Sequence, residues 1–155
     1  MFSVEEFSAG PLNDAKPLAL LYPTTQQPGP ILVGRHGDKR TALFLDKENR
    51  FRGFLFDWNE SFRGLIVNNV SIEMDPSAIS DPNYLDYPLG SIIRQGTGLY
   101  IQGIVDNSFQ RRHTICLIDG LSPLPDRHGV AFARWQLVYG QGLEKRVLMK
   151  FDLSS

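Results

Sequence analysis

The sequence predicts an all-β protein, mainly antiparallel, that folds as a single domain. Short apolar runs recur along the chain, and clusters of turn residues separate them. In the clearest run, Val70–Asp75, every second residue is apolar and the residues between are polar. Strict alternation of this kind is the pattern of a strand with one solvated face. No window offers about 12 residues of helical periodicity that is free of glycine and proline.

Turn residues delimit the expected strands. Pro17 and Pro23 confine the first apolar run, because proline lacks the N–H group that a sheet ladder needs. Polar residues 46–49 indicate a hairpin connection, and the glycines of residues 95–98 indicate another. Residues 114–118 are apolar on both faces, which suits a central strand. We expect nine or ten strands, at residues 18–22, 31–33, 43–45, 51–58, 70–75, 92–94, 99–106, 114–118, 131–139 and 147–153.

Helical structure is expected to be limited to one or two short turns near residues 76–87. Asp75-Pro76 and Asp81-Pro82 each combine a favourable N-cap with proline at the first helical position. The two starts are so close that each can begin only about one turn. Strands in this arrangement favour a β-barrel or a β-sandwich. We assign residues 1–15 to a loose N-terminal arm or edge segment, and residues 16–155 to one β domain.

Composition narrows the class of protein. A chain of 155 residues with 42% hydrophobic and 21% charged residues is ordinary for one globular domain. Its formal net charge of −1 gives no general attraction to nucleic acid or to a membrane surface, so neither partner is expected. The single cysteine, Cys116, lies in an apolar run and is interpreted as a buried hydrophobic residue. No signal peptide is evident, and we expect a cytoplasmic protein.

One short segment suggests an enzyme. Residues 31–40, with Arg35-His36-Gly37 after an apolar run, locally resemble the Arg-His-Gly signature of the histidine phosphatases. The resemblance implies an α/β fold, with His36 accepting the phosphoryl group and Arg35 holding its oxygens. A second catalytic histidine would be His113 or His128, and neither stands in a matching context. Because strands are expected on both sides, we interpret the segment as a charged hairpin loop that turns at Gly37-Asp38.

Other patterns of catalytic chemistry are missing from the sequence. No two histidines have the spacing of a metal site on one strand or helix. No nucleophile elbow, phosphate-binding loop or dinucleotide fingerprint occurs. Glu73 and Asp75 share a strand face at roughly 7 Å, a spacing that follows from strand rise and is met by any two alternate residues. We therefore predict no catalytic residue, no metal and no cofactor, and favour a protein that is not an enzyme.

Charge distribution supplies the candidate site. No lysine or arginine occurs between Arg63 and Arg94, whereas acidic residues and tyrosines gather there. An acidic surface with aromatic anchors suits a partner protein with a basic surface. The candidate partner-binding residues are Glu73, Asp75, Asp81, Tyr84, Asp86 and Tyr87.

These observations predict a non-enzymatic protein-interaction module, for example an inhibitor or immunity-type protein that uses this acidic, tyrosine-containing surface. One alternative is a β-barrel that binds a small molecule in its interior, which the ten phenylalanines and five tyrosines could line. A hydrolase or phosphoryl-transfer enzyme that uses His36 is the other. The sequence leaves the oligomeric state open.

Overall fold

The computed structural model describes residues 7–11, 18–23, 30–36, 39–45, 51–56, 63–79, 88–105, 112–117, 129–140 and 142–153. These residues form thirteen strands and two short 3-10 turns, and no α-helix occurs among them. The strands are β1 (Phe7–Pro11), β2 (Leu20–Pro23), β3 (Ile31–His36), β4 (Lys39–Phe44), β5 (Arg52–Phe56), β6 (Arg63–Val67), β7 (Val70–Met74), β8 (Ile92–Gln95), β9 (Gly98–Val105), β10 (Arg112–Cys116), β11 (Val130–Phe132), β12 (Arg134–Tyr139) and β13 (Arg146–Asp152). The turns are η3 (Pro76–Ala78) and η4 (Gly142–Glu144).

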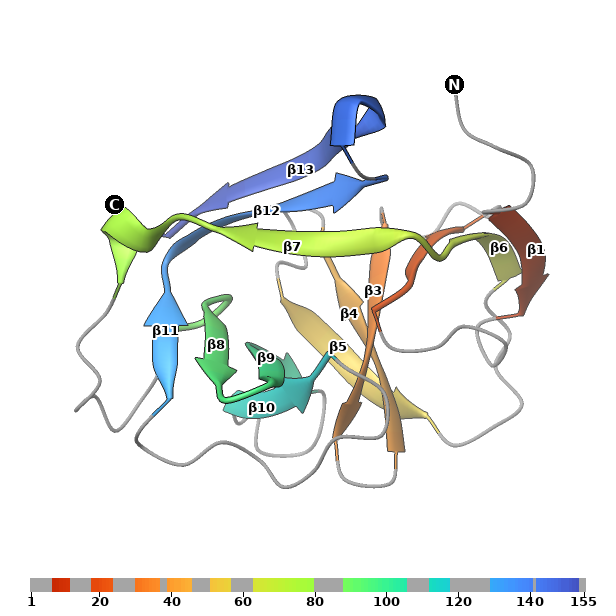
Figure 1. The fold of residues 1–155 in the computed structure, drawn as a ribbon. Helices are drawn as coiled ribbons and strands as arrows, with labels where there is room; N and C mark the ends of the chain where they lie inside the picture. The colour runs from red at the N-terminus through yellow and green to blue at the C-terminus, as the bar shows by residue number, and fades with distance from the viewer. Residues whose placement is uncertain are drawn as a thin grey trace.

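The described strands form two sheets (Figure 1). The large sheet has the order β1-β6-β2-β3-β4-β5-β9-β8-β11, and β10 pairs with both β9 and β3. The small sheet has the order β13-β12-β7. All of these pairs are antiparallel except β5 with β9. The predicted class, mostly antiparallel β, is therefore confirmed.

The structure has thirteen described strands instead of the predicted nine or ten, and the prediction fell short at three places. Strand β6 was not expected; its apolar residues are only the three that follow Arg63 and Gly64. Strand β1, which pairs with β6, lies within the segment assigned to a loose arm or edge segment. The run expected at residues 131–139 is two strands, because the chain leaves the large sheet at Ala133 and enters the small one.

Turn chemistry is confirmed at Asp75. Its side chain caps η3 by accepting a hydrogen bond from the backbone N–H of Ser77, and Pro76 occupies the first helical position. The second turn, η4, lies outside the region near 76–87 where helical turns were expected. It follows Gly140, and the positive φ angles of Gly140 (80°) and Gly142 (63°) allow the tight connection between β12 and β13.

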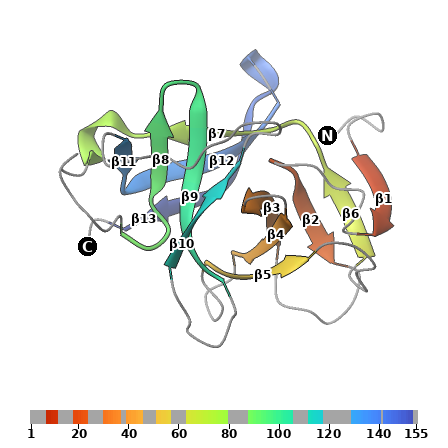
Figure 2. The same ribbon diagram turned by 90° about the horizontal axis from the view of Figure 1, so that it is seen from below.

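The core lies between the small sheet and the large one (Figures 1 and 2). The inner faces of β7, β12 and β13 contribute apolar side chains to one buried cluster that also includes residues of β3, β4, β8, β9 and β10. Trp135 is 2% exposed and stacks on Phe151, with 4.3 Å between ring centroids. Cys116 is buried in a neighbouring cluster, as expected. Among the described residues, no helix is long and apolar enough to span a bilayer.

Candidate functional site

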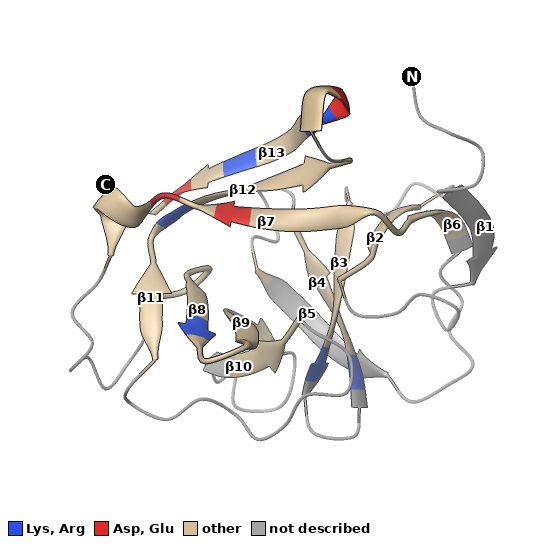
Figure 3. Cartoon of the chain, viewed as in Figure 1, with Lys and Arg blue, Asp and Glu red and all other residues tan. Residues whose placement is uncertain are grey.

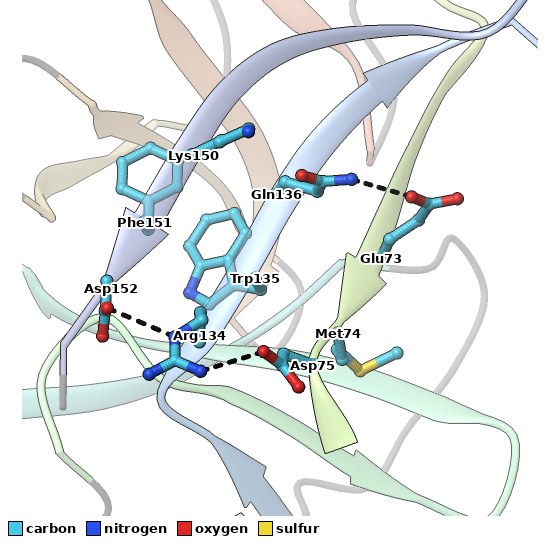
Figure 4. A pocket seen from close by; sticks show the side chains of 9 residues that line it. All are labelled: Glu73, Met74, Asp75, Arg134, Trp135, Gln136, Lys150, Phe151 and Asp152. Carbon is cyan, nitrogen blue, oxygen red and sulfur yellow. Dashed lines mark hydrogen bonds and ion pairs between the residues drawn. The ribbon is translucent and has the colours of Figure 1, made fainter. Parts of the chain in front are cut away.

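A hollow of about 500 Å³ lies over the small sheet (Figure 4). Three adjacent chain segments line this hollow, and each contributes three consecutive residues. The segments are residues 73–75 at the end of β7, residues 134–136 in β12 and residues 150–152 in β13. The lining residues are Glu73, Met74, Asp75, Arg134, Trp135, Gln136, Lys150, Phe151 and Asp152.

Strand register arranges these residues in rows across the sheet. Gln136 pairs with both Glu73 and Lys150, so these three side chains share one face. Arg134 lies in the next polar row, opposite Asp152 and beside Asp75, whose N–H donates to the Arg134 carbonyl at 2.9 Å. Between the two polar rows, Met74, Trp135 and Phe151 form a third row. Because successive residues of a strand point to opposite faces, this third row packs into the core while the polar rows face outward.

The guanidinium of Arg134 joins two carboxylates. Its Nη1 donates to Asp75 Oδ2 at 3.0 Å, and its Nε donates to Asp152 Oδ2 at 3.2 Å. Asp75 also accepts from the Ser77 hydroxyl at 2.7 Å and from the Ser77 N–H at 2.9 Å. These hydrogen bonds, those from Ser77 first and then that from Arg134, lower the pKa of Asp75 from 3.8 to about 2. The same carboxylates raise the pKa of Arg134.

Glu73 is held in a similar way in the neighbouring row. Lys145 Nζ donates to Glu73 Oε2 at 2.5 Å, and Gln136 Nε2 donates to Glu73 Oε1 at 2.9 Å. The hydrogen bond from Lys145, followed by that from Gln136, lowers the pKa of Glu73. Both carboxylates predicted from the sequence are therefore ionised at neutral pH and bonded within the chain, and neither has the raised pKa of a general acid.

Tertiary pairing largely offsets the negative charges of Glu73 and Asp75, the described members of the acidic tract. Acidic and basic residues occur on the neighbouring strands β7, β12 and β13 (Figure 3). The hollow is lined by three carboxylates and two cations, and Lys145 adds a third cation beside Glu73. Within the described part of the chain, the side chain of Lys150 forms no ion pair. The outer face of the small sheet is thus a surface of mixed charge, with the side chains of Asp75 and Arg134 37% and 43% exposed.

Sequence reasoning located part of this site. Glu73 and Asp75 share one face, as predicted, whereas Asp81, Tyr84, Asp86 and Tyr87 lie outside the described residues. The four remaining polar residues of the hollow were missed, namely Arg134, Gln136, Lys150 and Asp152. Their alternation with apolar neighbours was visible in the sequence. That alternation gives no information on which strands lie side by side.

The structure describes two of the three histidines that were considered for catalysis. The backbone of His36 ends β3 and pairs with Lys39 of β4, so the chain continues as an antiparallel strand and not as a helix. This pairing confirms the hairpin interpretation of the segment. His113 lies in β10 opposite Gly103, and His128 lies outside the described residues. Within the described ranges no group of three or more His, Cys, Asp or Glu side chains is arranged to hold a metal ion.

The low pKa of Asp75 predicts an acid-dependent loss of stability. Its pKa is about 2 in the folded protein and near 3.8 without these partners. The stabilisation from this carboxylate is therefore complete above pH 4 and is lost as the pH falls toward 2. We expect the thermal midpoint of the wild type to fall more steeply over this interval than that of Asp75→Asn, which keeps an oxygen to cap η3.

The control for this comparison is Glu144→Gln, at an exposed carboxylate that does not line the hollow. It should retain the full steepness of the wild type. Midpoints measured by circular dichroism between pH 5 and pH 2 test the prediction. Equal slopes for the wild type and Asp75→Asn would show that the hydrogen bonds to Asp75 add nothing to folding.

Fold and site together define an antiparallel β protein with a polar hollow on the outer face of a three-stranded sheet. Residues 9–155 match the family described as "Uncharacterised protein y4lG", and the chain belongs to this family. It is 37% identical over 148 residues to "Uncharacterized protein y4lG" of Sinorhizobium fredii (strain NBRC 101917 / NGR234). That alignment covers 96% of this chain and 91% of the relative. No solved structure matches the chain.

Proposed function

We propose that this chain is a non-enzymatic protein-interaction module and that it binds its partner on the outer face of the small sheet. The observation that carries the proposal is the preformed hollow, to which three adjacent chain segments contribute six polar side chains. Side chains on paired strands are held in place more rigidly than side chains on loops, so less entropy is lost when they bind. Trp135 and Phe151, anchored in the core beneath, keep β12 and β13 in place.

The charges of this face define the chemistry of the partner. Glu73, Asp75 and Asp152 are partly exposed carboxylates, and each already has a cation of the same chain nearby. A partner's guanidinium or ammonium groups would share these carboxylates with Arg134 and Lys145. A partner's carboxylate would pair with Lys150. The partner surface is therefore mainly basic, with an acidic group placed to meet Lys150.

An inhibitor or immunity-type protein is one concrete form of this function. In that form the acidic tract would cover a basic surface of the partner, and Glu73 and Asp75 would contribute to this contact from the small sheet. Asp81, Tyr84, Asp86 and Tyr87 follow them in the chain and would extend the contact. A cytoplasmic location accords with the presence of a single cysteine, because the cytosol keeps thiols reduced.

Quantitative affinity capture from cells that make the protein tests this proposal. The double variant Glu73→Gln, Asp75→Asn removes both charges and keeps the side-chain shapes. We expect it to weaken capture of the specific partner by on the order of tenfold at low salt. High salt should reduce the difference between wild type and variant, because it screens exposed charges. Glu144→Gln, which removes one exposed charge away from the hollow, should capture the partner as the wild type does.

Equal recovery of the same proteins by the wild type and the double variant would remove this face from the proposed function. Near-ultraviolet circular dichroism must first show that the variant is folded. Loss of capture by Glu144→Gln as well would indicate a general effect of charge and would also contradict a binding site at the hollow.

A small polar ligand in the hollow is the second candidate, favoured by the volume of about 500 Å³, which is typical of ligand sites. Binding inside a barrel has less support. Five strands pair in a ring, β3-β4-β5-β9-β10, but Leu43, Ile101 and Ile115 are fully buried in one cluster and fill the space that a ligand would need. A ligand of the hollow would shift the NMR signal of the Gln136 side-chain amide with no protein captured.

A further inference from the structure

Strand β7 forms one edge of the small sheet. Within the described strands it pairs with β12 on one side and with no strand on the other (Figure 1). Two hydrogen bonds to β12 and its end show how the backbone of this segment is oriented. The Asp75 N–H donates to the Arg134 carbonyl at 2.9 Å. The Asn69 carbonyl accepts from the Gly140 N–H at 3.2 Å. In an antiparallel pair this orientation repeats at every second residue, so Glu73 also directs its backbone groups at β12.

The backbone groups of Ile72 and Met74 therefore point away from β12, toward the open edge. Within the described part of the chain, the backbone of neither residue bonds to another segment on that side. Both side chains are only partly buried, and they pack against the main core cluster. The edge thus offers N–H donors, C=O acceptors and an apolar inner face to a further strand.

The edge at β7 lacks several features by which proteins protect an edge strand. Lysine, proline and bulges are common features of this kind. The strand Val70–Met74 contains neither lysine nor proline, and its register with β12 runs without a shift. At the opposite edge, β13 carries Lys150, and its register with β12 shifts between Leu137 and Val138. Of the two edges, β7 is therefore the one suited to accept another strand.

Glu73 determines what an added strand carries on its outer face. It accepts one hydrogen bond from Lys145 and one from Gln136, whereas a carboxylate can accept about four. Its side chain is 40% exposed. A lysine or arginine directly opposite Glu73 is favourable, because opposite charges attract across an antiparallel pair. A second copy of β7 would instead bring its own acidic residues beside Glu73 and Asp75, which disfavours self-pairing.

We propose that an extended segment of the partner protein pairs antiparallel with β7 and becomes the fourth strand of the small sheet. The segment alternates apolar and basic residues. Its apolar residues lie opposite Ile72 and Met74, exchange backbone hydrogen bonds with them and cover the inner face. Its basic residues lie on the outer face, opposite Glu73 and beside the hollow. This pairing rests on the proposed function, because it specifies how the basic partner contacts the small sheet.

A peptide of alternating lysine and valine, blocked at both ends, is the probe for this strand addition. At low salt its binding to the isotope-labelled wild type should slow hydrogen exchange of the Ile72 and Met74 amides about tenfold or more at saturation, as measured by NMR. The amide of Leu143, in the exposed turn η4, should not change. The same peptide with glutamate in place of lysine should bind at least about tenfold more weakly.

Methylation of the peptide backbone separates strand pairing from simple attraction between charges. A methyl group on each valine nitrogen removes the N–H groups that face β7, so this peptide should bind about tenfold more weakly or not at all. A methyl group on each lysine backbone nitrogen removes only N–H groups that face away from β7. This second peptide is the matched control and should bind as the parent peptide does.

Equal affinity of the two methylated peptides would overturn strand addition. A parent peptide that leaves the Ile72 and Met74 amides unprotected up to about 1 mM would overturn it as well. Either result is distinguishable from failure of the proposed function. If the double variant Glu73→Gln, Asp75→Asn still weakens capture of the partner, the outer face is the binding site and only the added strand is refuted.

Discussion

Replacing Trp135 by alanine should lower the free energy of unfolding by about 3–5 kcal/mol, the usual cost of removing a large buried aromatic side chain. Trp135 is 2% exposed and stacks on Phe151 at an interplanar angle of 25°. The Phe51 ring lies 6.3 Å away between centroids. The indole therefore links the small sheet to Phe51, the residue before β5 of the large sheet, and its removal leaves a cavity between the two sheets.

The variant Trp135→Phe separates packing from hydrogen bonding. It keeps an aromatic ring but removes the donor Nε1, which bonds the Gly90 carbonyl at 2.8 Å. An unpaired buried carbonyl costs about 1–3 kcal/mol, so this variant should lie between the wild type and Trp135→Ala. Urea unfolding followed by far-ultraviolet circular dichroism measures all three. A cost below about 1 kcal/mol for Trp135→Ala would show that the two sheets do not depend on this contact.

Replacing Gly90 by alanine should be destabilising by about 2–5 kcal/mol, because two separate costs apply there. The φ angle of Gly90 is +83°, a conformation that costs an L-residue about 1–2 kcal/mol. An added Cβ would also collide with the ring of Phe51, and overpacking of a core costs about 1–3 kcal/mol. Phe51 has little room to move, since it is 1% exposed and its own φ angle is +57°.

Gly96→Ala is the matched control for this prediction. Gly96 also has a positive φ, +58°, but no atom lies within 4 Å of the position that a Cβ would take. The conformational cost alone applies, and we expect about 1–2 kcal/mol. Urea unfolding of both variants checks the comparison. If Gly96→Ala proves as costly as Gly90→Ala, the collision with Phe51 contributes nothing and the contact between this turn and the core is not tight.

Local patterns predicted local structure well. The alternation of Val70–Asp75 predicted both β7 and the face that Glu73 and Asp75 share. The pair Asp75-Pro76 predicted η3, because an N-cap and a proline act on their immediate neighbours. The same reasoning failed at Ala133, where one alternating run crosses from one sheet to the other. Ala133 N–H donates to the Ala78 carbonyl, and the Ala133 carbonyl accepts from Leu153, contacts that involve residues far away in the chain.

By itself the sequence determined that the chain is built of antiparallel strands, which residues face outward, and that basic residues are missing between Arg63 and Arg94. These properties depend on side-chain period and composition, which are local. Only the tertiary structure decided that β12 lies between β7 and β13, and so brought Arg134 within 3.0 Å of Asp75. Strand order is set by packing between segments that are distant in the chain. The alternation of side chains along one strand does not specify which strand lies beside it. Glu73 and Asp75, two members of the acidic tract, thereby became part of a surface of paired charges in the fold.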